Sequence, residues 1–599
     1  MRYNKFMGKT RGAVSAILSG SQRLTADSRG RRFPAGLDSP ARANRDLLIL
    51  AVILLVYLGI GILYAAYTPA WQVPDEPAHY NYVRHLAETG RFPVLQMGDY
   101  PHDYLEELKA RRFPPDLPID PIRYESHQPP LYYLLAVPVY WLSGGEPLAL
   151  RLLSVALGAG LLLFAYRLVR AIFPRQPALA LGTAAFVAFL PMHVAMTAGV
   201  ENDTLAELLL AAVALLAVQH VLEGSEGVEG REGKRGSEGK GGAQGNLGEL
   251  RGTQRRMVWM GILLGLVLVT KTTAYAALPV ALAAVIWRWC LMHRAPRITT
   301  CRLLAQQLLA LLLPALLIAL PWYARNMAVY GWPDPLGLRW HNAIVVGQPR
   351  TAGWIATYGW ADFLRRFAGF SFKSFWGVFG WMGLFVDNRI YLALGLLSGV
   401  VMAGLLGLGA RKCGLWAGWG GKEKRGRREK RGLKGRRSGG AEGRGSEGAG
   451  ERRGGGAREQ GSRGGLVLMG VWLGWTVLQY LAYNITFVQH QGRYLFPALV
   501  PIGLAFALGW REALRPAVSR ALAALLALLV LVLAAVGLAT GDWPTWPLLF
   551  SALGAGGLFL RPWLPRRLDG WLFALPFIGL VILDLICLFG FIVPALSVW

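Results

Sequence analysis

Two neighbouring carboxylates, Asp75 and Glu76, stand between prolines within residues 71–80 (WQVPDEPAHY), shortly after the first long apolar run. The prolines fix the approach of the chain, and the residues that follow are typical of a helix start. A carboxylate here could act as a general base towards a hydroxyl group or bind a hard divalent cation. The alternative is that Asp75 caps the helix, and the spacing alone favours the cap.

A second polar group, at residues 124–133 (YESHQPPLYY), leads into a short apolar helix. His127 within it could bind a metal ion or a phosphate. The alternative is an aromatic belt at the membrane interface, and this alternative is the better one for the segment taken alone.

A third acidic group, at residues 201–204 (ENDT), separates two apolar runs. Asp or Asn before a helix is an ordinary cap. The order of the spans nevertheless places Asp203 on the same membrane face as Asp75, which favours a shared site. An ionised side chain costs about 2.5 to 3.5 kcal/mol at the bilayer centre but little at a span end, so position alone is not decisive.

Three cations lie at the external ends of predicted spans: Lys271, Arg325 and Arg493. They oppose the usual concentration of basic residues on the cytoplasmic side. Each could extend its side chain to the lipid headgroups. Their recurrence at three external span ends makes an anionic ligand, such as a lipid phosphate, an equally good explanation.

The apolar content of the chain places these residues in a membrane protein. Hydrophobic residues make up 54% of the 599 residues, against about 45 to 50% in soluble domains. We expect an all-α polytopic membrane protein with about 13 transmembrane helices, each roughly 20 residues long. The expected spans lie near residues 47–68, 148–171, 178–197, 204–222, 257–271, 273–291, 303–323, 389–410, 466–486, 493–510, 519–540, 545–561 and 571–598.

The net charge of +27 comes from basic residues that lie mostly in the loops between these spans. Such residues mark the cytoplasmic side, so the N-terminus should be cytoplasmic and nucleic acid is not an expected partner. No removable signal peptide is recognisable, and the first span should remain as an anchor.

The same pattern predicts the division of the chain into segments. Residues 131–142 are too short to span and should form an interfacial helix. The expected segments are a basic cytoplasmic tail (1–46), a catalytic transmembrane module (47–410) with a first external loop (68–146), a disordered cytoplasmic loop (223–256) and an external loop (326–388), a disordered basic cytoplasmic loop (411–465), and C-terminal transmembrane helices (466–599).

Taken in order, these motifs resemble the GT-C membrane glycosyltransferases over roughly residues 47–510, in particular bacterial protein O-mannosyltransferase-like proteins and the lipid A aminoarabinose transferase. The resemblance implies a polyprenyl-phosphate-linked sugar donor and a reaction on the extracytoplasmic face. It also implies that Asp75 is catalytic, that Glu76 is the neighbouring acid, and that Asp203 belongs to a second acidic motif.

The resemblance also bears on metal and substrate binding. The aminoarabinose enzyme has Glu-Lys-Pro where this chain has residues 127–129 (HQP), so His127 takes the place of a metal-binding Glu and Gln128 that of a Lys. This departure puts metal use in doubt. A divalent ion held by Asp75, His127 and Asp203 stays a candidate, and no other cofactor is predicted. The expected substrate and lipid-phosphate ligands are Lys271, Arg325, Arg493, His127, Gln128 and Asp203.

We therefore expect a multi-pass glycosyltransferase of the plasma or inner membrane, a hexosyl or pentosyl transferase that inverts the anomeric configuration. Asp75 should be the base that activates a hydroxyl acceptor, and protein, glycolipid and polysaccharide acceptors all remain open. The partners are the lipid-linked donor and membrane lipid. The alternative is a secondary transporter or flippase for a lipid-linked or anionic substrate, which would usually place ionisable residues near mid-bilayer in broken helices. The predicted span interiors are nearly free of charge, with Glu207 and Asp584 as exceptions, which favours the transferase. A non-catalytic scaffold is a third hypothesis.

Overall fold

The computed structural model describes residues 40–233, 242–292, 298–413 and 447–597. The chain divides into two units, Met1–Leu48 and Ile49–Trp599, and the site described below lies within the second. The all-α prediction is confirmed, since the only strands among the described residues are β1 (Val378–Phe379) and β2 (Leu384–Phe385), which pair antiparallel.

The helices of the first half are α2 (Pro40–Tyr67), α3 (Glu76–Thr89), α4 (His102–Ala110), η1 (Tyr124–His127), α5 (Leu131–Ser143), α6 (Pro147–Ile172), α7 (Pro177–Ala188), α8 (Pro191–Thr197), α9 (Asp203–Gly233), α10 (Gly242–Leu268), η2 (Thr272–Ala276) and α11 (Ala277–Met292). Those of the second half are α12 (Ile298–Tyr330), α13 (Leu338–Ile344), α14 (Thr351–Trp376), α15 (Asn388–Lys412), α17 (Glu447–Thr486), η3 (Gly492–Ala498), α18 (Leu499–Ala513), α19 (Pro516–Thr540), α20 (Thr545–Leu560), η4 (Arg561–Trp563), η5 (Arg566–Leu568), α21 (Asp569–Ile586), η6 (Cys587–Ile592) and α22 (Val593–Leu596).

Long apolar helices confirm that this is a multi-pass membrane protein. Within the described part of the chain, 10 helices are long and apolar enough to cross a membrane, or 11 if α7 and α8, bent by 63°, form one broken span. The predicted spans near 257–271 and 545–561 coincide with helices α10 and α20, which are not among those 10. The figure of about 13 spans therefore stays a prediction.

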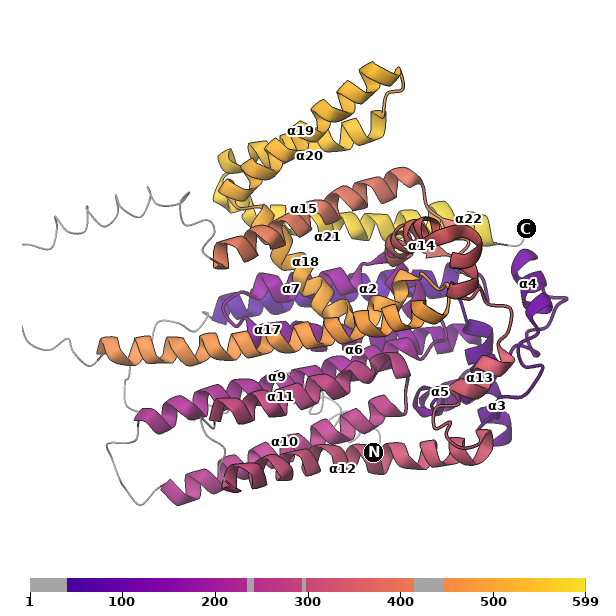
Figure 1. Ribbon diagram of the computed structural model, residues 1–599, viewed down its shortest axis with the longest axis horizontal. Coiled ribbons are helices and arrows are strands. Elements are labelled where there is room, and N and C mark those ends of the chain that lie inside the picture. The colour runs from indigo at the N-terminus through magenta and orange to yellow at the C-terminus, as the bar shows by residue number, and fades with distance from the viewer. Residues whose placement is uncertain (1–39, 234–241, 293–297, 414–446, 598–599) are drawn as a thin grey trace, which may run out of the picture. The chain divides into compact units, whose positions relative to one another are not determined.

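The predicted first external loop contains helices α3, α4 and α5. Helix α5 has 13 residues, so it reaches about 20 Å against a hydrocarbon core of about 30 Å and cannot span alone. Helices α3, α4, α5, α13 and α14 gather at one end of the bundle, on the right of the view (Figure 1). We call this the site end.

Helix α9 forms the centre of the bundle. Its apolar window is 78% buried, more than that of any other candidate span, and it packs against α6, α11 and α17. Small residues allow the closest approaches elsewhere, as at Gly404 of α15 and Gly509 of α18, where an added Cβ would come within 2.3 Å of backbone oxygen. Small residues at such crossings are typical of membrane helix packing.

Two predicted loops are shorter than expected. Helix α9 continues to Gly233 and α10 begins at Gly242, within the predicted loop 223–256, and α17 begins at Glu447, within the predicted loop 411–465. A helix already formed in the membrane adds residues without a new nucleation cost, which explains the extensions. Residues 234–241 and 414–446, and residues 1–39 of the predicted basic tail, lie outside the described residues.

Candidate active site

Asp75 does not cap helix α3. Its backbone is in the left-handed region (φ 68°) and its side chain makes no capping hydrogen bond. The carboxylate instead accepts hydrogen bonds from the Tyr124 hydroxyl at 2.6 Å and from Arg493 Nη2 at 3.1 Å. A left-handed non-glycine residue costs roughly 1 to 2 kcal/mol and persists only where its surroundings hold it. The cap that the spacing favoured is therefore wrong, and the carboxylate faces a cavity.

Glu76 lies in a different environment from its neighbour. It is fully buried and pairs with Arg151, with Oε1 2.7 Å from Nε and Oε2 2.7 Å from Nη2. It also accepts the backbone N–H groups of Trp71 and Val200 at 3.0 and 3.2 Å. Glu76 is not among the residues of the cavity wall. Its contacts anchor the loop that carries Asp75, and its catalytic role stays a prediction.

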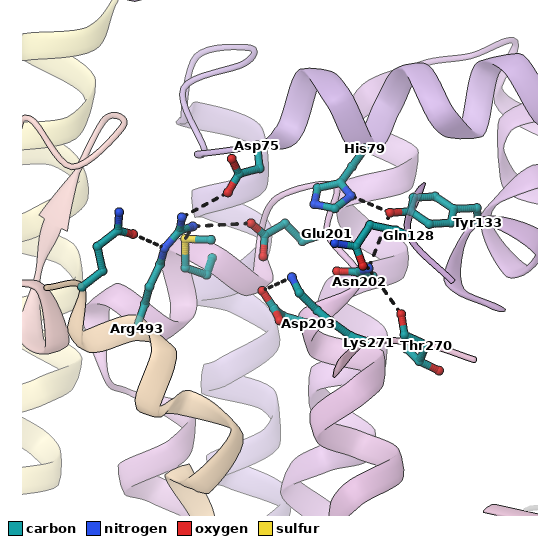
Figure 2. A network of polar contacts seen from close by, with 12 residues as sticks. Asp75, His79, Gln128, Tyr133, Glu201, Asn202, Asp203, Thr270, Lys271 and Arg493 are labelled. Carbon is teal, nitrogen blue, oxygen red and sulfur yellow. Dashed lines mark hydrogen bonds and ion pairs between the residues drawn. The ribbon is translucent and has the colours of Figure 1, made fainter. Parts of the chain in front are cut away.

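Arg493 connects two of the predicted acidic motifs. Nη2 contacts Asp75 at 3.1 Å, and Nη1 lies 3.8 Å from Glu201 Oε1 (Figure 2). Nε donates to the Gln491 side-chain oxygen at 2.7 Å. Arg493 is the second residue of η3, which follows the end of α17 after a short segment. Its charge thereby reaches acidic residues that follow two other helices, α2 and α8.

Lys271 forms the second ion pair of the site. Its ammonium lies 2.8 Å from Asp203 Oδ2 (Figure 2). Lys271 follows α10 and Asp203 begins α9, so two helix ends form this pair. Asp75, Glu201, Asp203, Lys271 and Arg493 together are called the charge cluster below.

The protonation states of the cluster follow from burial and from these partners. Burial, and next the neighbouring Asp203, raise the pKa of Glu201 well above its ordinary value, which favours the protonated, neutral form of this carboxyl. Burial alone would raise the pKa of Asp75, but Arg493 and Tyr124 outweigh it and lower that pKa. Burial likewise opposes the charge of Lys271, but Asp203 and Glu201 raise its pKa. Asp75 is therefore ionised and Lys271 is charged.

The cluster opens onto a cavity of about 440 Å³. This volume lies within the range of about 300 to 1,000 Å³ typical of small-molecule sites. Polar residues of its wall are Asp75, His79, Glu125, His127, Gln128, His193, Thr197, Asp203, Thr204, Glu207, Lys271, Thr272, Thr273, His341, Asn342, Gln348, Gln479 and Arg493. Its aromatic and apolar wall includes Met196, Leu338, Val345, Tyr480, Tyr483, Phe487, Tyr494, Phe496 and Pro497.

On one side of this wall, neutral polar side chains form hydrogen bonds with one another and with the backbone. His79 Nδ1 lies 2.8 Å from the Tyr133 hydroxyl, and Asn202 Nδ2 lies 3.5 Å from Gln128 Oε1 and 3.4 Å from the Thr270 carbonyl (Figure 2). The prediction of site residues did not include His79. Its position four residues after Asp75, on one helix face, was the signal that could have found it.

Arg325 does not join the other two predicted cations. Its guanidinium donates to the Pro93 carbonyl at 2.6 Å and stacks over the Trp322 ring at 4.7 Å. Arg325 is not part of the cavity wall. These contacts tie the end of α12 to the segment after α3, and the role of Arg325 in binding substrate stays a prediction.

The residues predicted to bind a metal ion do not form a ligand set. Asp75, His127 and Asp203 all line the cavity, but no group of three or more His, Cys, Asp or Glu side chains within the described ranges could hold a metal ion. His127 Nδ1 instead donates to the Tyr124 carbonyl at 3.2 Å, and burial, followed by the neighbouring His341, lowers the pKa of His127 to about 3. The residues do not fit a metal centre here.

Several solved structures show some likeness to this chain. They include ArnT from Cupriavidus metallidurans bound to undecaprenyl phosphate (14% identity, TM-score 0.42, covering 92% of this chain and 77% of that one) and the arabinosyltransferase EmbB from Mycobacterium smegmatis (13%, 0.44, 94% and 42%). The Pmt1-Pmt2 protein O-mannosyltransferase complex of S. cerevisiae bound to the sugar donor is a third (16%, 0.32, 48% and 34%). Likenesses at these scores carry no argument about this chain.

Sequence comparison gives a more local result. No curated protein matches the chain. Residues 127–227 match the family model described as dolichyl-phosphate-mannose-protein mannosyltransferase. This stretch contains His127, Gln128, Glu201 and Asp203 of the site, and the match confirms over these residues the resemblance to lipid-phosphate-dependent glycosyltransferases.

Proposed function

We propose that this protein is a membrane glycosyltransferase of the GT-C type that moves a sugar from a polyprenyl-phosphate donor to a hydroxyl acceptor. The observation that carries the proposal is one cavity at the end of the spans whose wall contains an ionised carboxylate, Asp75, beside two cations, Lys271 and Arg493. The family-model match over residues 127–227 supports the same donor chemistry.

The proposed site faces away from the cytoplasm. Helices α6, α15 and α18 run away from the site end, and their far ends carry Arg170, Arg411 and Arg511 respectively. Basic residues at span ends are typical of the cytoplasmic side. This distribution supports an extracytoplasmic reaction in the plasma or inner membrane.

The charge balance of the cluster suggests how donor binding prepares the base. With Glu201 neutral, the two carboxylates Asp75 and Asp203 balance the two cations Arg493 and Lys271. A lipid phosphate entering the cavity must compete for these cations. Arg493 then turns from Asp75 to the phosphate, and the freed carboxylate becomes more basic because its cationic partner has moved away.

The reaction that follows is a single displacement. The acceptor oxygen attacks the anomeric carbon, its proton passes to Asp75, and the bond between that carbon and the phosphate oxygen breaks. The electron pair leaves with the polyprenyl phosphate, where Lys271 and Arg493 stabilise the developing charge. One displacement inverts the anomeric configuration. Protein, glycolipid and polysaccharide hydroxyls all satisfy this chemistry as acceptors.

The test uses membranes that contain the full-length protein and radiolabelled polyprenyl-phosphate sugars. Asp75→Asn should lower the rate of sugar transfer by about 10² to 10⁴, the usual contribution of a positioned general base. Asp120→Asn is the matched control, because Asp120 is exposed and pairs with Arg84 outside the cavity. Transfer by Asp75→Asn at the wild-type rate would show that the assignment is wrong.

A further inference from the structure

A second ionisable pair lines the cavity and has no part in the mechanism above. His193 of α8 and Glu207 of α9 lie with Nε2 and Oε2 2.9 Å apart. Both side chains are buried, and both belong to the cavity wall. Glu207 follows Asp203 by four residues, so it stands about 6 Å further along α9 than this member of the charge cluster.

The hydrogen bonds of His193 determine the protonation state and the net charge of this pair. Nδ1 lies 2.9 Å from the carbonyl of Val187, which only accepts, so Nδ1 carries a proton. The bend of 63° between α7 and α8 leaves that carbonyl available. Nε2 and the Glu207 carboxyl must then share one further proton, because two lone pairs would repel at their separation. The pair is neutral as a whole.

The surroundings of the pair are largely apolar. The Phe496 ring lies 5.4 Å from the His193 ring in an edge-to-face arrangement, and Met196 and Pro497 belong to the same wall. Ligand sites commonly place a few oriented polar groups in such a wall. A neutral pair that can both donate and accept is suited to hydroxyl groups rather than to an ion, because hydroxyls do the same.

We propose that His193 and Glu207 bind hydroxyl groups of the donor's sugar ring and so select which polyprenyl-phosphate sugar is used. This inference rests on the proposed function. The sugar is bonded directly to the phosphate. Glu207 lies about one helical turn along α9 from Asp203, the partner of Lys271, and both belong to the same cavity wall, so a sugar beside a bound phosphate lies near the pair. A site built to bond a hydroxyl discriminates strongly against a substrate that lacks it, because its own polar groups then stay unpaired.

The experiment measures the binding of two classes of lipid to the purified full-length protein. One class is sugar-free polyprenyl phosphate, and the other is polyprenyl phosphate that carries a hexose or a pentose. His193→Leu and Glu207→Met should each weaken binding of the preferred sugar-bearing lipid by about tenfold and change binding of the sugar-free lipid by less than about twofold. Glu207→Gln should bind almost as wild type, because its amide can donate to Nε2 and its oxygen can accept. His220→Leu is the control, since His220 is fully buried on α9 outside the cavity wall.

The outcomes separate the subsite from the proposed function. Equal losses for both lipids, or no loss for either, would overturn the subsite, and so would a change confined to the KM of the acceptor. Thermal unfolding of each variant identifies a folding defect. If one of His193→Leu and Glu207→Met is defective, the ratio of the two affinities in the other decides, and Glu207→Gln should keep the wild-type ratio. Lys271→Met tests the proposed function separately, because undiminished binding of sugar-free polyprenyl phosphate would contradict the cation site whatever the other variants show.

Discussion

Asp75 and Glu76 are adjacent in the sequence, yet their carboxylates lie in regions with opposite properties. Both oxygens of Glu76 pair with Arg151 in a closed, fully buried arrangement, whereas Asp75 faces the cavity and shares Arg493 with Glu201. The first region matches each charge with a dedicated partner. In the second, Arg493 contacts two carboxyl groups and borders the cavity, so an anionic ligand can compete for a cation that has no dedicated partner.

The difference implies that Glu76 supports folding and Asp75 supports chemistry. Glu76→Gln should have the largest effect on stability, a loss of about 3 to 5 kcal/mol, because it leaves Arg151 charged, buried and without its counter-ion. Thermal unfolding in detergent measures this, with Asp75→Asn as the comparison that should change little. The double variant Glu76→Gln with Arg151→Met should recover part of the loss. Equal unfolding temperatures for wild type and Glu76→Gln would remove the distinction between the two regions.

The backbone of Asp75 gives a second, smaller test of the same comparison. Its φ of 68° is tolerated by Asp and Asn but strained in Ala. Asp75→Ala should therefore be less stable than Asp75→Asn by about 1 to 2 kcal/mol, although both should lose transfer activity. Chemical or thermal unfolding of the two variants checks the difference. Identical stabilities would mean that the loop relaxes and that its strain is not maintained by the surroundings.

Sequence reasoning found the parts of the site that follow from helix order. The alternation of spans places Asp75, Asp203, Lys271 and Arg493 at one end of the bundle, and the structure brings these residues together in two ion pairs. It could not assign Glu76, because its partner Arg151 lies 75 positions away within an apolar run. Periodicity shows which face of a helix is apolar but not which buried charge on one helix meets another.

Side-chain direction and helix breaks account for the remaining differences. Arg325 stands at the expected span end, but its guanidinium turns to Pro93 and Trp322 and away from the cavity. His193 and Glu207 meet because the chain bends by 63° between α7 and α8. A proline such as Pro191 signals a break, but its direction depends on the neighbouring helices.

Glu201 is the member of the charge cluster without a cation of its own, and its substitution should have the smallest effect. One of its oxygens, Oε2, is buried without a hydrogen-bond partner within the described part of the chain. Burial and Asp203 raise its pKa, so the native state holds a proton that the unfolded state releases above the ordinary carboxyl pKa. Wild-type stability should therefore fall as pH rises from the ordinary pKa towards the raised one.

Glu201→Gln should remove this pH dependence, because the amide imitates the protonated carboxyl at every pH. At neutral pH the free energy of unfolding of the variant should be within about 1 kcal/mol of that of wild type. As the pH rises, the variant should become increasingly more stable than wild type. Unfolding temperatures at acid, neutral and alkaline pH measure this, and sugar transfer should continue because Glu201 takes no direct part in the proposed displacement. Loss of transfer by a variant that keeps its stability would mean that Glu201 is ionised and holds Arg493. The cluster would then carry three negative charges, and the proposed balance of two carboxylates against two cations would be wrong.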